Sequence, residues 1–481
     1  MIKQLMIIGG IIFMTSILEA ATPKKYGYVP LSFPRDPSEV NQFAEHIVLG
    51  QILEPMVDTD KFGNVTPGLA ESWVFEDKGL TVKFKIRTDR VFSSGKKLES
   101  KDIKYTIDRI IEKKSQSSNF LASIASVEAP APDALVIRLK EPNVSILKAL
   151  SRDQLGVVPS GWSFDKNSSE PIVGSGPYRL LKKEKNWNLE VNPKYPAAAA
   201  ISIKEWQLVF FADQNSAVPL TVMPDYASGI TLSTKAGMQK ANGFQNLKVA
   251  DQISFAQTSA WWHPHGVHFA STEMKGRAMG LVEEILAEGC KKLELERATG
   301  VIPKGVAGHI AVTQSPKLAH KKYEKLETLR LAFIAATFDE LLKKVDIQVL
   351  AKDHGFKVEV IKILPSEMDQ IAGKKPDVIF AGWAGGFNDP EGFIALLPTF
   401  LVKDFGTYIG PGISEIYKRA RQEQNWTARS DLFQEINSQL RKTQLMVPGW
   451  RIPFFVVGKP NMISEEETFR YTPRLHTLKE Q

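Results

Sequence analysis

Apolar and polar side chains alternate regularly through residues 80–87, where leucine, valine, phenylalanine and isoleucine are separated by threonine, lysine and arginine. This period of two predicts a strand with one buried face. The turn-forming residues 76–79 come directly before it, so residues 73–75 are predicted to form the partner strand of a hairpin. A helix is predicted next, capped by Ser100, with four isoleucines on one face: Ile103, Ile107, Ile110 and Ile111.

A second pattern, in residues 329–363, predicts a β-α-β unit. Residues 329–333 alternate as one strand, and residues 356–363 form the next. Between them, Thr337 and Glu340 have the spacing of a capping box, and Gly355 is placed to end the helix. Because a helical crossover joins parallel strands with right-handed geometry, the two strands are predicted to be parallel.

Length and composition narrow the class of protein. A chain of 481 residues is too long for one core, so two or three domains are expected. The net charge of +7 is spread along the chain without a basic stripe containing aromatic residues, which argues against nucleic-acid binding. The single cysteine, Cys290, excludes an intrachain disulfide and is predicted to be buried on the apolar face of a helix.

Residues 1–20 have the composition of a secretory signal peptide. Lys3 supplies the charged start, residues 5–18 are mostly apolar, and Ala20 and Ala21 offer small residues for cleavage. The apolar run is short for a membrane span, and no cysteine follows it that could carry a lipid anchor. We therefore expect export to the periplasm of a Gram-negative bacterium, with retention of the segment as an N-terminal anchor as the alternative.

Three further stretches read as motifs. The first, in residues 67–109, contains PGLAESW, FKIR and SSGKKLESKDIKYTIDR. The second is GSGPYRL at 174–180, followed by Asn-Pro-Lys-Tyr at 192–195. The third is Gly-Trp at 382–383 with Asp-Pro at 389–390.

The glycines of the second motif have a predicted backbone role. Gly174 and Gly176 suit a turn that needs positive φ, and Pro177 fixes the start of the following strand. A glycine-rich turn can also cradle phosphate. Here no Lys-Ser or Lys-Thr pair follows, and a strand rather than a helix comes next, so a phosphate-binding loop is excluded.

In order and spacing, the three motifs resemble those of the family 5 extracellular solute-binding proteins, the peptide, dipeptide and nickel receptors of ABC importers. The resemblance implies an α/β, two-lobed periplasmic-binding-protein fold (type II, large peptide-receptor subclass), with an extra subdomain in lobe I and a hinge between the lobes. The division that it implies is a signal peptide at 1–20, lobe I at 22–66, 172–265 and 456–481, an insert subdomain of lobe I at 67–171, and lobe II at 266–455.

The resemblance also implies the function. The lobes are expected to close around a small polar ligand, with peptides as one class, and to deliver it to an ABC transporter permease in the inner membrane. The chain is expected to be a monomer and not an enzyme, without cofactor or metal; it carries neither a nucleophile elbow nor His-Glu-x-x-His. The residues expected to line the cleft are Trp383, Gly385, Gly386, Phe387, Asn388, Trp261, Trp262 and His263.

The chain departs from the family pattern in two places. Peptide receptors of the family usually place an aspartate after the Gly-Trp pair, at the position of Gly386, where it pairs with the ligand's α-ammonium group. A buried ammonium without a counter-charge costs several kcal/mol, so ordinary peptide binding becomes a weaker expectation. Asp389 is expected to fix the turn before Pro390 instead of replacing that acid. The family's Gly-Glu-Ile-Asp is also absent near residues 227–231.

Several alternatives stay open. His263, His265 and His268 lie within six residues, which suggests a metal, but Pro264 and Gly266 bend the segment, so a polar turn or a ligand-contacting platform is expected instead. A metal-chelate receptor of the nickel type is one alternative function. A transport-inactive sensor or scaffold with the receptor fold is another. For Trp383, a core position under the sheet is the alternative to a place in the cleft.

Overall fold

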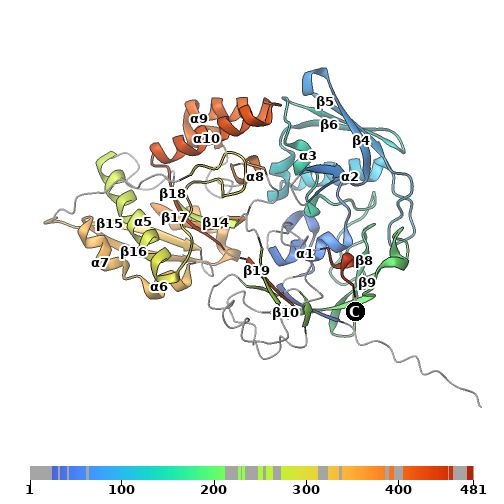
Figure 1. Cartoon of the computed structure of the whole chain (residues 1–481), viewed down its shortest axis with the longest axis horizontal. Helices are drawn as coiled ribbons and strands as arrows, with labels where there is room; N and C mark the ends of the chain where they lie inside the picture. Colours follow the sequence, from blue (N-terminus) through green and yellow to red (C-terminus); the bar gives the residue numbers. More distant parts are fainter. Residues whose placement is uncertain are drawn as a thin grey trace, which may run out of the picture.

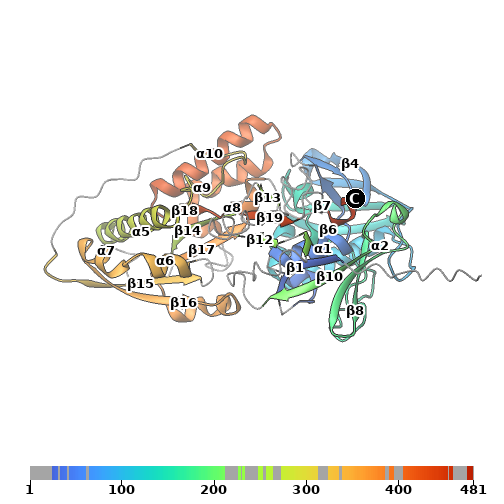
Figure 2. The same ribbon diagram turned by 60° about the horizontal axis from the view of Figure 1, so that its bottom comes forward.

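The computed structural model describes residues 24–30, 33–40, 43–60, 64–211, 226–228, 230–232, 248–252, 256–263, 272–311, 323–334, 338–384, 389–394, 405–452, 454–458 and 474–479. Two lobes lie side by side, each built on a five-stranded sheet, and a three-stranded sheet lies between them (Figures 1 and 2). The predicted signal peptide lies outside the described residues. Among the residues that the structure describes, no helix has the length and apolar character needed to span a membrane.

The sheet of lobe I has the order β11-β1-β10-β9-β8. β1 runs parallel to β10 and β11, whereas β9 pairs antiparallel with both β10 and β8. Helix α1 packs against β1 and β8. The elements of this lobe are β1 (Lys24–Pro30), α1 (Phe43–Ile52), β8 (Tyr178–Lys183), β9 (Asn186–Val191), β10 (Glu205–Phe211) and β11 (Tyr226–Ser228).

Tyr178 of the second motif lies in the core of this lobe. Its side chain is 1% exposed, and its hydroxyl donates to the carbonyl oxygen of Ile203 at 2.9 Å and accepts from Nε1 of Trp206 at 3.2 Å. Burial raises the pKa of Tyr178 to about 12. The hydroxyl is therefore neutral and makes two hydrogen bonds within the core.

The glycines of the second motif serve a close backbone approach. Neither Gly174 nor Gly176 has a positive φ, so the predicted reason for them was wrong. The amide of Gly176 donates to the carbonyl oxygen of Ile52 at 2.8 Å, and a Cβ at Gly176 would lie 2.6 Å from that carbonyl group. The side chain of Asn192 closes the turn by donating to the carbonyl oxygen of Gly176 at 2.9 Å.

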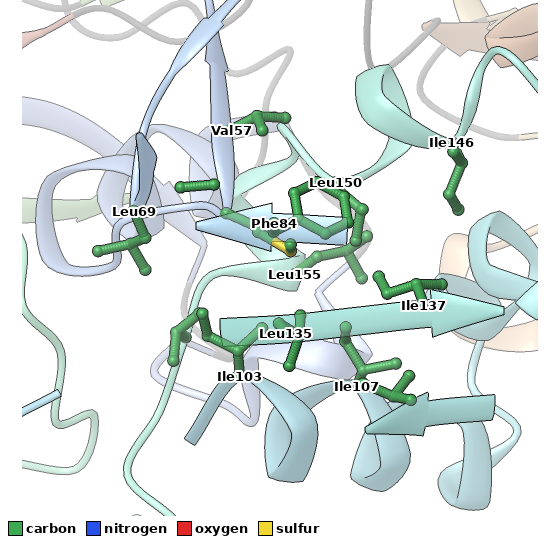
Figure 3. Close-up of a cluster of buried hydrophobic side chains, with 14 of the residues drawn as sticks. Val57, Leu69, Phe84, Ile103, Ile107, Leu135, Ile137, Ile146, Leu150 and Leu155 are labelled. Carbon is green, nitrogen blue, oxygen red and sulfur yellow. The ribbon is translucent and has the colours of Figure 1, made fainter. Parts of the chain in front are cut away.

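The insert subdomain has an antiparallel sheet of order β4-β5-β7-β6, with helix α2 packed on it. The predicted hairpin is confirmed, because β4 and β5 pair antiparallel across the turn at 77–79. Figure 3 shows the shared core, in which side chains of the strands and of α2 meet Leu150 and Leu155. The strands and helices are β2 (Val57–Thr59), β3 (Val65–Pro67), β4 (Ala70–Glu76), β5 (Thr81–Ile86), α2 (Ser100–Lys113), β6 (Ile124–Ala131), β7 (Ala134–Leu139) and α3 (Ile146–Ala149).

Helix α2 begins one residue earlier than the predicted cap implied. Glu99 is the N-cap, and its amide donates to the carboxylate of Asp102 at 2.9 Å. Ser100 is the first helical residue, and its hydroxyl bonds the carbonyl oxygen of Ala131. Three of the four isoleucines on the predicted apolar face are buried, whereas Ile111 is 36% exposed.

Two buried aspartates tie α2 to its surroundings. Asp102 accepts from Nζ of Lys96 at 2.6 Å and from the amide of Ser160 at 2.8 Å. Asp36, which precedes the chain's first helical turn, pairs with Arg109 and with Lys113, whose Nζ lies 2.8 Å from its Oδ2. For both carboxyls burial favours the neutral form, but the hydrogen bonds and cations outweigh it and lower the pKa of each aspartate.

Lobe II has a mixed sheet of order β16-β15-β17-β14-β18. The predicted β-α-β unit is confirmed, since β15 and β16 pair in parallel. α5, α6 and α7 cover the face containing Trp262, and α8, α9 and α10 cover the face containing Trp261. The elements are β14 (Ala256–Trp262), α5 (Thr272–Leu293), β15 (Glu327–Ile334), α6 (Asp339–Lys344), α7 (Ile347–Asp353), β16 (Phe356–Ile363), β17 (Val378–Ala384), α8 (Glu391–Ile394), α9 (Phe405–Gln422), α10 (Trp426–Lys442) and β18 (Met446–Arg451).

The crossover between β15 and β16 contains two helices where one was predicted. α6 ends at Lys344, and Asp346 starts α7 by accepting the amides of Gln348 and Val349. Thr337 of the predicted capping box lies outside the described residues. Gly355 ends α7 with a φ of 78°, as predicted, and Cys290 is buried in α5.

The boundary between the lobes differs from the one implied by the sequence. β14 pairs with β17 and β18, so the chain has already entered lobe II at Ala256, before the implied boundary after residue 265. The three-stranded sheet between the lobes has the order β12-β19-β13 and is formed by β12 (Ile230–Leu232), β13 (Lys248–Gln252) and β19 (Phe454–Gly458). Both lobe crossings leave from this sheet, which Figure 2 shows between the lobes and which has the position of a hinge.

Short 3-10 segments complete the described structure. They connect the longer elements in both lobes and are η1 (Pro37–Glu39), η2 (Asp77–Gly79), η3 (Gln116–Leu121), η4 (Asp153–Leu155), η5 (Ala198–Ala200), η7 (Pro365–Lys374) and η10 (Leu475–Thr477).

Candidate functional site

The third motif lies at the carboxyl end of β17, at the side of lobe II that meets lobe I. The backbone of Trp383 belongs to β17 and pairs with Gln257 of β14. Gly385, Gly386, Phe387 and Asn388 lie outside the described residues. The chain resumes at Asp389, directly before α8. The expected ligand-binding loop is therefore held at both ends by regular structure.

The other aromatic candidates are core residues. Trp261 and Trp262 lie next to each other in β14, point to opposite faces of the sheet and are both fully buried. His263 is 1% exposed, and its amide donates to the carbonyl oxygen of Asp377 at 2.8 Å. These three side chains do not present a surface to a cleft in this conformation. They are buried because helices cover both faces of the sheet at β14.

The histidine cluster is only partly described. His265 and His268 lie outside the described residues. Within the described part of the chain, no group of three or more histidine, cysteine, aspartate or glutamate side chains is placed to hold a metal ion.

Asp389 forms a buried ion pair with Arg429 of α10. Its two carboxylate oxygens accept from Nη1 and Nη2 of Arg429 at 2.9 and 3.0 Å, and both side chains are at most 3% exposed. Oδ1 also accepts the amide of Glu391 at 2.9 Å, so Asp389 fixes the turn at Pro390, as expected. Burial alone would raise the pKa of Asp389, but the guanidinium of Arg429 and the nearby ammonium of Lys148 hold it below its usual range.

A second ion pair lies beside the first. Oε1 of Glu391 accepts from Nε of Arg421 in α9 at 2.9 Å. Arg421 also reaches the insert subdomain, where its Nη1 bonds the carboxylate of Glu141 and its carbonyl oxygen accepts the amide of Val144 at 3.2 Å. Arg421 thus connects two carboxylates that belong to different lobes.

The insert subdomain makes a further contact through α3. The hydroxyl of Ser145, at the start of α3, lies 3.1 Å from Oδ1 of Asp389 and also bonds Nη2 of Arg429. Nζ of Lys148 lies 3.8 Å from Oδ2 of Asp389 and 4.9 Å from the ring centroid of Trp426. We call this group the inter-lobe bridge; it consists of Glu141, Val144, Ser145 and Lys148 on the insert and Asp389, Arg421, Trp426 and Arg429 on lobe II.

A cavity of about 680 Å³ lies at the same junction. Its walls come from the insert, with Val65 and Lys148, and from lobe II, with Val306, Trp426 and Asp431. The ring of Trp426 is 53% exposed. The cavity combines one aromatic surface with groups of both charges, which is a surface suited to a polar ligand.

A comparison with known families finds a match to the middle part of the chain. Residues 64–253 match the model of the bacterial extracellular solute-binding proteins, family 5 (middle). Over this segment the chain is similar to the family 5 extracellular solute-binding proteins. This family consists of binding proteins and not of enzymes, in agreement with the sequence-based prediction.

Two relatives show how far the similarity extends. A protein of Brucella ovis named for peptide binding in an ABC transporter is 32% identical over 192 residues, which are 34% of this chain and 36% of that protein. The aligned segment thus spans about a third of that relative. A protein of Pseudomonas aeruginosa named "Probable di/tripeptide-binding protein 5" is 23% identical over 440 residues, 80% of this chain and 81% of that protein.

Solved structures with low sequence identity share the whole fold. The murein tripeptide binding protein MppA of Escherichia coli superimposes with a TM-score of 0.78 at 15% identity, over 95% of this chain and 99% of its own. NikA of Brucella suis, in complex with Fe(III)-EDTA, gives a TM-score of 0.76 at 16% identity, over 96% and 100% of the two chains. The predicted two-lobed α/β fold of the type II binding proteins is confirmed.

Sequence reasoning did not find the inter-lobe bridge. Arg429 and Asp389 are 40 residues apart, and Ser145 and Arg429 are 284 residues apart. Arg429 shares the buried face of α10 with Phe433, Ile436 and Leu440. An arginine on the apolar face of a helix was the available signal, because such a residue is rarely buried without a partner.

Proposed function

We propose that this chain is a periplasmic solute-binding protein of an ABC importer. It captures a small polar ligand, with peptides as one class, by closing its two lobes, and delivers it to a permease in the inner membrane. The arrangement that supports the proposal best is the pair of lobes joined through the β12-β19-β13 sheet, with Asp389, shortly after the end of β17, in contact with the insert subdomain. Export through the segment 1–20 and action as a monomer are part of the same proposal.

The proposed ligand contacts lie in the loop after Trp383. We propose that Gly385, Gly386, Phe387 and Asn388 line the cleft, with Trp383 at its edge. Trp261, Trp262 and His263 support the sheet from within and are not retained as direct contacts, because they are buried. In the open α/β sheets of binding proteins, ligands bind beyond the carboxyl ends of strands, which is where this loop begins.

The glycine at position 386 leads to a prediction about the ligand. Without an acid there, a free α-ammonium group has no counter-charge in the loop, so an N-acetylated tripeptide is expected to bind about as well as the free tripeptide. Gly386→Asp should improve binding of the free tripeptide roughly 10- to 100-fold, the equivalent of a charge-assisted hydrogen bond of about 1.5–3 kcal/mol. Gly386→Asn is the matched control, because it has the same shape without the charge.

Isothermal titration of the three proteins with trialanine and N-acetyl-trialanine measures these affinities. Native mass spectrometry of the full chain from a periplasmic preparation should in addition show a co-purified small molecule. No added mass, together with flat titrations against peptides and against Ni(II)-histidine, would contradict a binding function.

The absence of an acid at Gly386 also favours a second candidate, a receptor for a metal chelate. The fold is shared with NikA of Brucella suis in complex with Fe(III)-EDTA and with NikZ of Campylobacter jejuni in complex with Ni(L-His). Heat release with Ni(II)-histidine and none with the tripeptides would select this candidate.

A further inference from the structure

We propose that the inter-lobe bridge is a latch that holds the closed state of the protein, acting through contacts between the insert subdomain and lobe II. This inference goes beyond the proposed function, since it concerns how the lobes are held and not what they bind. Figure 1 shows α9 and α10 extending from lobe II toward α3 of the insert. The contacts between them cross the junction at a point away from the hinge sheet.

The insert side of the bridge is rigid. α3 has only four residues, but Ile146 and Leu150 anchor it in the hydrophobic core of the insert, as Figure 3 shows. The side chain of Asn143 accepts the amide of Ser145 at 3.0 Å and donates to the hydroxyl of Ser123 at 3.0 Å. Ser145 is therefore positioned before lobe II arrives, so little side-chain entropy is lost when the contact forms.

On the lobe II side of the bridge, the ion pairs form without any residue of the insert. The pairs Asp389–Arg429 and Glu391–Arg421 lie within lobe II and stay formed when the lobes separate. Within the described bridge, opening then breaks only the contacts to Glu141, Val144, Ser145 and Lys148. No buried charge loses its only partner, so the bridge can open and close at moderate cost. A latch needs this property, whereas a permanent domain contact does not.

The bridge is also connected to the proposed ligand loop. Asp389 directly follows residues 385–388, and its carboxylate receives both the guanidinium of Arg429 and the hydroxyl of Ser145. The end of the loop is thus attached to lobe II in either state and to the insert only when the lobes are closed. A ligand that binds better to the closed lobes would be coupled to the bridge, because both favour the same arrangement.

Two substitutions test the latch without a ligand. Ser145→Ala removes a hydrogen bond to charged groups, and Glu141→Gln removes the charge facing Arg421. Each should shift the ratio of closed to open molecules roughly tenfold toward the open state. The matched controls are Ser118→Ala, whose hydroxyl bonds only within the insert, and Glu128→Gln, whose exposed ion pair with Arg138 lies within one sheet.

Single-molecule energy transfer in the full chain reads this ratio, with dyes at Lys101→Cys on α2 and Lys352→Cys on α7; Cys290 is buried and stays largely unlabelled. The expected result is a larger long-distance population in both bridge variants and wild-type behaviour in both controls. Unchanged populations in Ser145→Ala and Glu141→Gln, or a wild-type protein that is wholly open, would overturn the proposal. If Ser145→Ala does not fold, the more exposed Glu141→Gln decides alone. Because no ligand is used, failure here leaves the proposed function standing.

Discussion

The contact between Gly176 and the end of α1 makes a quantitative prediction for Gly176→Ala. An added Cβ would lie 2.6 Å from both the carbonyl carbon and the oxygen of Ile52, and 2.8 Å from the carbonyl oxygen of Gln51, where ordinary contacts begin near 3.4 Å. All of these are backbone atoms, so no side chain can rotate away. The amide of Gly176 also bonds the carbonyl oxygen of Ile52 at 2.8 Å, which keeps the two segments together.

The expected cost follows from how firmly α1 is held. Val48, Leu49, Ile52 and Leu53 are at most 1% exposed, so α1 cannot move without disturbing the core of lobe I. Overpacking of a core costs about 1–3 kcal/mol and occasionally more, and a clash between two backbones belongs at the upper end, near 3 kcal/mol. For a protein whose unfolding free energy is about 5–15 kcal/mol, this is a large fraction.

Urea titration followed by tryptophan fluorescence measures the free energy of unfolding of Gly176→Ala. Gly276→Ala is the control, since nothing lies within 4 Å of a Cβ at that position inside α5. The control should be stabilised by about 0.5–1 kcal/mol, because alanine is the better helix former. A Gly176→Ala protein within about 0.5 kcal/mol of wild type would refute the argument from close backbone approach.

Two further predictions concern lobe I and the insert. Tyr178→Phe should lower the free energy of unfolding by about 1–3 kcal/mol, because it removes hydrogen bonds to two buried groups, the carbonyl oxygen of Ile203 and the indole N–H of Trp206; a thermal melt of unchanged midpoint would contradict this. Asp36 and Asp102 have lowered pKa values in the folded protein, so they stabilise it above the unfolded-state pKa of about 3.9, and this stability is lost as pH falls through the folded-state values. The contribution of these two groups to the free energy of unfolding should therefore change little from pH 7 to about 5 and decrease below about pH 4. Asp36→Asn with Asp102→Asn should reduce the dependence on acid pH.

Local patterns in the chain were sufficient for most secondary structure. The hairpin of β4 and β5 and the parallel pair of β15 and β16 follow from alternation of period two, because each strand has one face that must be buried. The positive φ of Gly355 follows from its place after a helix. Boundaries were less certain, as the cap at Glu99 and the break at Asp346 show, since several nearby polar residues could serve each end.

The candidate site depended much more on the tertiary structure. Trp261 and Trp262 were predicted to line the cleft, but the structure places them in a strand covered on both faces. Their burial depends on helices supplied by distant segments, which no local pattern specifies. Gly176 shows the same limit, because its requirement comes from the carbonyl group of Ile52, more than a hundred residues earlier.

By itself, the sequence determined the class of fold: its motifs, their order and the periodicity of its strands specify a two-lobed α/β protein. The tertiary structure alone decided where the chain crosses between lobes and which charges meet across the junction. The physical reason is the separation along the chain between the residues that interact. Strand alternation and helix capping are set by neighbours within a few residues, whereas the contact of Ser145 with Arg429 exists only when the insert and lobe II are brought together.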